Sequence, residues 1–461
     1  MEIIRNFESL IYNGLTDGDR RARAICLNIL NRVLEEINPV NMIKSNVTRN
    51  GSMLNVCGVT FNLDDFQHIY LVGFGKSSHV MSLIMEQLIG DRISKGFINV
   101  YRGVKFKSLT GKVEFIEAGH PIPDTNGQKG AEEIVRIVSE ASEHDLVICL
   151  ISGGGSSMTP LPADGISLEE KQQVTQLLLK SGATIEEVNA VRKHISAFKG
   201  GLLAKYAHPA RVVSLIISDV VGDKLDVISS GPTSPDSSTF QDAYRVLVKY
   251  NLWHHIPEAV RRRIEAGLNG EVEETPKPRD IVFEKVHNFI IGSNRLACRI
   301  AARTAGEIGL NSTILSSAIE GEARHVGSVY GGILFEEALE GCPIKKPAVL
   351  IAGGETTVTV RGSGIGGRNQ ELVLAACMKI RGLRSVAIAS IGTDGVDGLT
   401  DAAGAIADGK TVQRAFEANL DPEEYLNNND SYRFFKELND LVFTGPTGVN
   451  LMDIAVMVAL E

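Results

Sequence analysis

The sequence predicts an α/β protein of two domains, each built around a mainly parallel sheet. Apolar runs of strand length alternate with stretches of helical spacing along the whole chain. Glycine-rich turns follow many of these apolar runs, which is typical of parallel strands that lead into helices. The 461 residues also exceed the size at which one hydrophobic core stops growing, which favours two domains.

Composition excludes several classes of function. Hydrophobic residues make up 43% of the chain and charged residues 22%, which is ordinary for a globular protein. A formal net charge of −9 argues against a nucleic-acid surface and against adhesion to anionic lipid, but not against a local cationic site for an anionic metabolite. No apolar run approaches the roughly 18 residues that a membrane span needs, and the N-terminal residues do not resemble a targeting peptide.

The six cysteines lie singly, without metal-ligand or redox spacing. Three of them, Cys149, Cys298 and Cys377, fall inside apolar or helical stretches. The ten histidines form no zinc-ligand motif. We therefore expect reduced structural thiols in a cytoplasmic protein, and no zinc.

Helical spacing over residues 1–50 precedes a series of strand–turn–helix units. One such unit is predicted over 68–88. The apolar run Leu146–Ile151 is typical of a strand covered on both faces, although periodicity alone does not exclude a buried helix. Other predicted elements are β structure over 53–63, a strand within 103–125, helices over 127–142, 167–182 and 184–201, a strand over 211–217 and a helix from Gln241.

The predicted domain boundary lies at Asn269–Asp280, a charged segment with two prolines. We assign residues 1–275 to a first domain and 276–461 to a second, whose last strands have the alternative of packing back on the first. Strand–turn–helix units resume at 287–302 and continue through the second half. Because ligands of open α/β sheets bind at the carboxyl ends of strands, glycine loops in both halves predict a site in the interdomain cleft.

Two glycine-rich loops are predicted to bind anions through backbone N–H groups, because they carry almost no side-chain bulk. A plain strand-to-loop turn is the alternative for either loop alone, and their recurrence favours anion binding. The residues of the first loop are Ser152, Gly153, Gly154, Gly155, Ser156 and Ser157, and those of the second are Gly353, Gly354, Glu355, Gly364, Gly366 and Gly367.

The segment GFGKSS matches neither standard nucleotide-binding pattern. The first glycine of a Walker A loop would fall at Tyr70, and Ser78 stands where a dinucleotide fingerprint needs its third glycine or an alanine. The segment therefore indicates a phosphate site of another kind, or none.

Two cations are predicted at helix N-termini, where positive charge opposes the helix dipole at a cost on the order of 0.3–1 kcal/mol. Lys76 stands in the GFGK turn, and Arg368 follows four glycines. An anionic ligand would remove the conflict, and a planar guanidinium suits a phosphate or carboxylate. The alternatives are a solvated Lys76 and an exposed loop arginine at 368.

Asp219 follows the strand predicted over 211–217, so its carboxylate is expected to overhang the sheet edge. It could accept a hydroxyl proton or hold Mg²⁺, whereas simple turn formation is the alternative. Asp223 and Asp394 are further candidate metal ligands, since Mg²⁺ needs only one or two carboxylates beside phosphate oxygens. His120 and His194 lie in distinctive settings but are more often structural there, and a phosphate or carboxylate contact at His194 and Lys199 stays open.

Seven groups of motifs stand in order between about residues 70 and 455: VGFGKSS, GHPIPDTNG, LISGGGSSM, NAVRKHISAFKGG, ISDVVGD with SSGPT, GGETTVTVRGSGIGGRNQE and IGTDGVDGLTDAAGA. A single one is unspecific, whereas the ordered set is specific. Together they resemble the class II glycerate kinases, the glycerate 2-kinases with a MOFRL C-terminal domain.

The resemblance implies ATP- and Mg²⁺-dependent phosphorylation of D-glycerate at its 2-hydroxyl. It implies a Rossmann-like N-terminal domain and a smaller α/β C-terminal domain that enclose the site. The catalytic residues of the family fall on Lys76, Asp219 and Arg368. The choice of the 2-hydroxyl rests on the resemblance alone, and a homodimer stays an open alternative.

Members of this family have also been labelled hydroxypyruvate reductases, which would use NADH or NADPH. The missing dinucleotide fingerprint counts against that alternative. A non-catalytic module that binds phosphosugars through similar serine- and glycine-rich loops is the other alternative.

Overall fold

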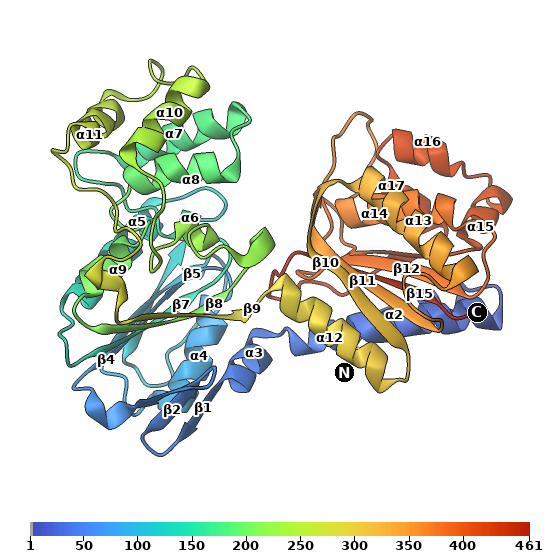
Figure 1. The fold of residues 1–461 in the computed structure, drawn as a ribbon, viewed down its shortest axis with the longest axis horizontal. Coiled ribbons are helices and arrows are strands. Elements are labelled where there is room, and N and C mark those ends of the chain that lie inside the picture. Colours follow the sequence, from blue (N-terminus) through green and yellow to red (C-terminus); the bar gives the residue numbers. More distant parts are fainter. Residues whose placement is uncertain (1–2) are drawn as a thin grey trace. The chain divides into compact units, whose positions relative to one another are not determined.

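A computed structural model describes residues 3–461 and divides into two compact units (Figure 1). The central unit comprises Pro39–Ile291, and the discontinuous unit comprises Met1–Asn38 with Gly292–Glu461. This division differs from the expected ranges 1–275 and 276–461. The first helices belong with the C-terminal half, and the segment up to Ile291 belongs with the central unit because its strand extends the central sheet.

The central unit holds a six-stranded sheet in the order β6-β5-β4-β7-β8-β9. Strands β4 to β8 pair in parallel, and the chain order 3-2-1-4-5-6 is that of a Rossmann-like doubly wound sheet, as expected. Every residue of β4 and β7 is buried, which confirms the buried strand Leu146–Ile151. The strands are β4 (Ile69–Phe74), β5 (Lys95–Tyr101), β6 (Val113–Ala118), β7 (Leu146–Ile151), β8 (Arg211–Ile217) and β9 (Val286–Gly292).

Strands β4 and β7 lie at the point where the strand order reverses, and ligands of such sheets bind outside the carboxyl ends of strands at this point. Phe74 at the end of β4 pairs with Ile151, and Ile151 pairs with Ile216 near the end of β8. The loops that follow these three strands therefore start at the same level of the sheet.

Helices α7, α8, α10 and α11 gather at one end of the central unit, away from the sheet (Figure 1). They share a core of their own that includes Val174, Val191, Phe240 and Ile264. Ser167 and Thr184 form the capping boxes of α7 and α8. The helices of this unit are α3 (Pro39–Asn46), α4 (Ser78–Ile89), α5 (Thr125–Ser139), α6 (Gly155–Met158), α7 (Leu168–Lys180), α8 (Ile185–His194), α9 (Leu202–Ala207), α10 (Phe240–Lys249) and α11 (Glu258–Leu268); the small antiparallel sheet is β1 (Val47–Asn50), β2 (Met53–Val56) and β3 (Val59–Asn62).

The discontinuous unit has a mixed sheet in the order β10-β11-β15-β12-β13-β14. Only β10 and β11 pair in parallel, so the expectation of a second mainly parallel sheet was wrong. Strand β15 lies in the middle of this sheet, so the last strand belongs to the core of the discontinuous unit, where α2 packs against it. The strands are β10 (Asn311–Glu322), β11 (Ala348–Thr357), β12 (Val386–Gly392), β13 (Gly404–Asp408), β14 (Leu441–Val442) and β15 (Asp453–Ala459).

Helices cover both faces of this sheet. Helices α2 and α12 pack against β12, β15 and β11, whereas α13 and α14 form a core with aliphatic residues of the same strands on the other face. Among residues 3–461, no helix combines the length and the apolar character that a bilayer crossing requires. The helices are α1 (Phe7–Tyr12), α2 (Asp17–Glu36), α12 (Asn294–Glu307), α13 (Ala323–Glu340), α14 (Arg368–Lys379), α15 (Thr411–Glu417), α16 (Pro422–Asn427) and α17 (Ser431–Glu437).

A buried arginine ties α2 to this unit. Arg23 is 0% exposed, and its Nη1 lies 2.8 Å from Oδ2 of Asp408. Its Nη2 contacts Asp440, and its Nε donates to the carbonyl of Leu10 at 2.5 Å. Both carboxylates are fully buried, and Arg414 also reaches Asp440. The N-terminal helix therefore supplies the cation that two buried carboxylates of the C-terminal half require.

We expect Arg23→Ala to destabilise the discontinuous unit, because Asp408 loses its cation and Asp440 keeps only Arg414. Breaking such a buried pair costs about 3–5 kcal/mol, which corresponds to a fall of about 10 °C in the midpoint of thermal unfolding. Calorimetry measures this midpoint. Arg20→Ala removes an exposed pair with Asp17 and is the matched control, with a shift below about 2 °C. Equal midpoints in the two variants would contradict the anchoring role of Arg23.

Candidate active site

The predicted first glycine loop lies beside the loops that follow β4 and β8. The backbone N–H of Lys76 donates to the carbonyl of Gly153 at 2.9 Å, and that of Ser77 donates to Oγ of Ser152 at 3.0 Å. From the far side, Oγ of Ser229 donates to the carbonyl of Ser152 at 3.3 Å. The structure thus brings together segments that lie up to about 150 residues apart in sequence at the switch point of the sheet.

Two positions in this loop require glycine. A Cβ on Gly153 would lie 2.2 Å from Oδ2 of Asp219, and a Cβ on Gly154 would lie 2.7 Å from Cδ2 of His120. Gly154 also has a φ of 81°, in the left-handed region that favours glycine. The carboxylate of Asp219 and the ring of His120 therefore rest directly on the loop backbone.

Lys76, Asp219 and His120 influence one another electrostatically. Burial raises the pKa of Asp219, and the nearby charge of Lys76 opposes that rise. Burial and then the charge of Lys76 lower the pKa of His120 to about 4. His120 is consequently neutral at physiological pH, and a carboxylate with a raised pKa is a stronger proton acceptor.

A cavity of about 590 Å³ opens beside this group in the central unit. Its lining includes Asp219 and His120, and it also includes Lys171, Arg192 and Lys199. The sequence analysis missed Lys171 and Arg192. A signal was present for Lys171, which stands at helical spacing between Leu168 and Val174, so that it falls on the buried face of its helix.

In the discontinuous unit, Arg368 is the first residue of α14 and is surrounded by carboxylates. Its Nε and Nη2 lie 2.6 and 2.9 Å from the two oxygens of Asp453, and its Nη1 lies 3.1 Å from Oε1 of Glu355. Burial alone would lower the pKa of Arg368, but Asp453 and Glu355 raise it. The positive charge of Arg368 still opposes the helix dipole, but Asp453 and Glu355 offset this cost. The position of Arg368 at the helix N-terminus is therefore no longer an argument for a bound anion.

The N-terminus of α14 is capped by the carboxylate of Asp397. Asp397 accepts from the N–H of Asn369 at 3.1 Å and from that of Gln370 at 2.9 Å. A Cβ on Gly367 would lie 2.2 Å from Cγ of Asp397, which explains a glycine there. Burial and the charge of Asp453 raise the pKa of Asp397 to about 6.

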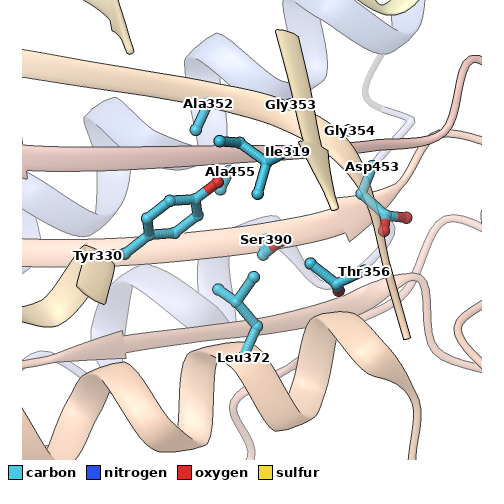
Figure 2. A pocket seen from close by; sticks show the side chains of 10 residues that line it. All are labelled: Ile319, Tyr330, Ala352, Gly353, Gly354, Thr356, Leu372, Ser390, Asp453 and Ala455. Carbon is cyan, nitrogen blue, oxygen red and sulfur yellow. The ribbon is translucent and has the colours of Figure 1, made fainter. Parts of the chain in front are cut away.

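The second glycine loop divides into parts with different surroundings. Gly353, Gly354 and Glu355 lie within β11, so this part of the expected loop is a paired strand. Figure 2 shows the two glycines beside Asp453, with Tyr330 and Leu372 around the same small hollow. That hollow holds about 10 Å³, about the minimum for a single water molecule, so it is a packing space and not a ligand site.

The remaining glycines border a larger cavity of about 760 Å³ in the discontinuous unit, which Glu355 and Arg368 also line. Several backbone N–H groups that we expected to hold phosphate are already bonded within the protein. The N–H of Gly364 donates to the carbonyl of Asn428 at 3.0 Å, and that of Ile365 donates to Asp430 at 2.9 Å. Gly366 and Gly367 also line this cavity, and their N–H groups make no hydrogen bond to the described residues. These two N–H groups are therefore available to a ligand.

No group of three or more histidine, cysteine, aspartate or glutamate side chains is arranged to hold a metal ion among residues 3–461. The predicted metal ligands Asp219, Asp223 and Asp394 therefore form no preassembled cluster. Asp223 nevertheless has a buried Oδ1 without a hydrogen-bond partner among the described residues. Oδ1 of Asp394 accepts from the N–H of Val396 at 3.1 Å.

The sheet order and the loops at its switch point define the central unit as a Rossmann-like domain with a cavity beside the carboxylate of Asp219. Family models match the chain over residues 25–265, for a domain of unknown function (DUF4147), and over 348–453, for the MOFRL family. The glycerate 2-kinase of Pyrococcus horikoshii is 43% identical over 95% of this chain and 97% of its own length. A putative hydroxypyruvate reductase of Agrobacterium vitis is 40% identical over 83% of this chain and 85% of its own length.

The crystal structure of a glycerate kinase from Thermotoga maritima matches with a TM-score of 0.84 and 40% identity, over 98% of this chain and all of that one. Similarity of this extent confirms the α/β fold and the resemblance that was based on the seven groups of motifs. The chain belongs to the class II glycerate kinase family, the glycerate 2-kinases with a MOFRL domain.

The proximity of Lys76 and His120 is testable by NMR titration. The ring protons of His120 should titrate with a midpoint near the pKa of about 4, below the ordinary 6.5. Lys76→Met removes a neighbouring cation, so the His120 pKa should rise part of the way, because burial remains. Since the folded-state pKa lies below the unfolded value, the stability that His120 contributes is present above pH 6.5 and is lost as the pH falls toward 4. An unchanged midpoint in Lys76→Met, as expected of the exposed control Lys180→Met, would contradict this arrangement.

The pairing of Arg368 with Asp453 leads to a second prediction. Arg368→Ala leaves Asp453, which is 7% exposed, without its main cation, and we expect a loss of about 3 kcal/mol. The double variant Arg368→Met/Asp453→Asn removes both charges and should regain most of that loss in urea unfolding. A double variant as unstable as Arg368→Ala would show that the ion pair is not the source of the effect.

Proposed function

We propose that this protein is a glycerate 2-kinase that transfers the γ-phosphoryl group of ATP to the 2-hydroxyl of D-glycerate. The observation that carries the proposal is Asp219, a carboxylate of raised pKa that lies against the backbone of Gly153, within the electrostatic reach of Lys76. The near full-length similarity to glycerate kinases supports the choice of glycerate as the acceptor.

In this mechanism Asp219 accepts the proton of the acceptor hydroxyl while the oxygen of that hydroxyl forms a bond to the γ-phosphorus of ATP. The bond between that phosphorus and the oxygen bridging to ADP breaks, and ADP leaves. Lys76 and Arg368 are the proposed cations for the glycerate carboxylate and the transferring phosphoryl group. In the loop 152–157, the N–H groups of Ser152, Gly155 and Ser157 are bonded within the protein. The N–H groups of Gly153, Gly154 and Ser156, with those of Gly366 and Gly367, are the proposed phosphate donors.

Mg²⁺ fits a carboxylate that lacks a partner, and Asp223 is the residue that best meets this condition. Asp219 and Asp394 are the further proposed ligands. When bound, the ion would neutralise charge on the phosphate oxygens. A cytoplasmic location is proposed because all six cysteines are free thiols in the structure, and thiols stay reduced in the cytosol.

The relative named as a putative hydroxypyruvate reductase makes that activity the second candidate. The structure offers a physical argument against it. Oγ of Ser78, at the third position of the would-be dinucleotide fingerprint, donates to the carbonyls of Gly75 and Asn99, both at 2.8 Å. A dinucleotide fold places a glycine or alanine there for close helix–strand packing.

One assay separates these functions. Purified protein with ATP, Mg²⁺ and D-glycerate should produce ADP and a 2-phosphorylated product, identified by phosphorus NMR. Asp219→Asn should lower kcat by about 100-fold or more while ATP still binds, and Glu143→Gln, an exposed residue of the same unit, is the control. NADH oxidation with hydroxypyruvate would instead support the reductase, and ligand binding without turnover would support a non-catalytic module.

A further inference from the structure

The cavity of about 590 Å³ in the central unit contains three cations that the proposed reaction has not used. Lys171 on α7 is 5% exposed, Lys199 after α8 is 0% exposed, and Arg192 lies in the last turn of α8. Exposed apolar side chains, among them Leu179 and Ile185, complete the lining. The cavity is thus reachable from solvent yet lined by buried positive groups.

None of the three cations is paired with a carboxylate of the described residues. Nζ of Lys171 donates to the carbonyl of Leu161 at 2.8 Å. Nζ of Lys199 donates to the carbonyls of Ser156 at 2.7 Å and Thr159 at 3.3 Å. The residue next to Arg192 shows the ordinary arrangement, since Lys193 contacts both Asp226 and Asp236.

Unpaired buried cations are unusual because burial disfavours charge and like charges repel. Burial lowers the pKa of Lys171 and that of Lys199 well below the ordinary value, and the charge of Arg192 lowers both further. Burial also lowers the pKa of Arg192 itself, to about 10. An anion that enters the cavity would relieve this repulsion, so the cavity is electrostatically suited to an acidic ligand.

Arg192 has the geometry to bind such an anion directly. Its Nη2 donates to Oγ of Ser156 at 2.6 Å, and the structure shows no other hydrogen bond from this guanidinium to the described residues. The remaining donors are therefore free for an oxyanion, which a guanidinium can bind in a bidentate manner. Ser156 is fixed from the other side by Oγ of Ser230 at 2.9 Å, so the position of Arg192 is well defined.

Ser156 also connects Arg192 to Asp219. It stands three residues after Gly153, on which the Asp219 carboxylate rests, and both Arg192 and Asp219 line the same cavity. In a 2-hydroxy acid the carboxylate and the hydroxyl are on adjacent carbons. A ligand whose hydroxyl lies at Asp219 would therefore have its carboxylate only a few ångströms away.

We propose that Arg192 binds the carboxylate of the acceptor, and that Lys171 and Lys199 position the loop around it. This assignment rests on the proposed function and narrows it. The carboxylate, which was shared between Lys76 and Arg368, goes to Arg192, and those two cations then bind phosphoryl groups only. The assignment makes Arg192 the residue that distinguishes a hydroxy acid from an uncharged polyol of the same size.

The test compares Arg192→Met with wild type, and with Arg245→Met, which removes an exposed arginine of the same unit. In Arg192→Met the KM for D-glycerate should rise about 30-fold or more, because a buried charged partner is lost, while the KM for ATP stays unchanged. The ratio of kcat/KM for D-glycerate to that for glycerol should fall by a similar factor. Arg192→Lys, which keeps the charge without the bidentate fork, should be intermediate, and it serves as the test if the methionine variant does not fold.

A rise in the KM for ATP with an unchanged KM for D-glycerate would overturn the assignment, because Arg192 would then bind the nucleotide. Calorimetric titration of D-glycerate without nucleotide keeps the test independent of turnover. Loss of this binding in Arg192→Met supports the proposal even if the wild type shows no kinase activity. Equal binding in both proteins, or no binding to the wild type, overturns it, whereas the assay with ATP decides the proposed function separately.

Discussion

In-register hydrogen bonding between β4, β7 and β8 is the interaction on which the candidate site depends. Because Phe74, Ile151 and Ile216 occupy the same level of the parallel sheet, the three following loops begin side by side. The loops then bond to one another through backbone groups, as Lys76 does to Gly153. Gly153 and Gly154 have no Cβ, which allows Asp219 and His120 to approach the backbone of the loop. Strand register and two glycines without side chains thus determine where Asp219 and His120 lie.

The cations that line the cavity of the central unit and two arginines of the discontinuous unit have opposite surroundings. Arg368 and Arg23 in the discontinuous unit are each held by two carboxylates, so their charges are compensated within the protein. In the central unit, Arg192 and its two buried lysine neighbours bond to hydroxyl and carbonyl groups only. Neutral partners satisfy hydrogen bonds but leave net positive charge. The charge of Arg192 is therefore not compensated by a carboxylate of the described residues.

Local features of the site were predictable from sequence. Strand β7, its glycine loop and the strand-end position of Asp219 follow from an apolar run with a glycine-rich exit, which depends on neighbouring residues alone. The partners of Arg368 were not predictable, since Asp453 lies 85 positions away and meets it only through the order of strands in the sheet. The antiparallel pairing of β15 was missed for a related reason, because a strand buried on both faces has the same apolar run in either direction.

The separation of Arg23 from its partners has a consequence for biosynthesis. Helix α2 is made before the central unit, and Asp408 and Asp440 are made only after the whole of it. At ordinary translation rates that interval is on the order of tens of seconds. During it the strands that α2 packs against, β12 and β15, do not yet exist, so they cannot cover its apolar face. The nascent chain must therefore keep α2 from premature association until these strands emerge.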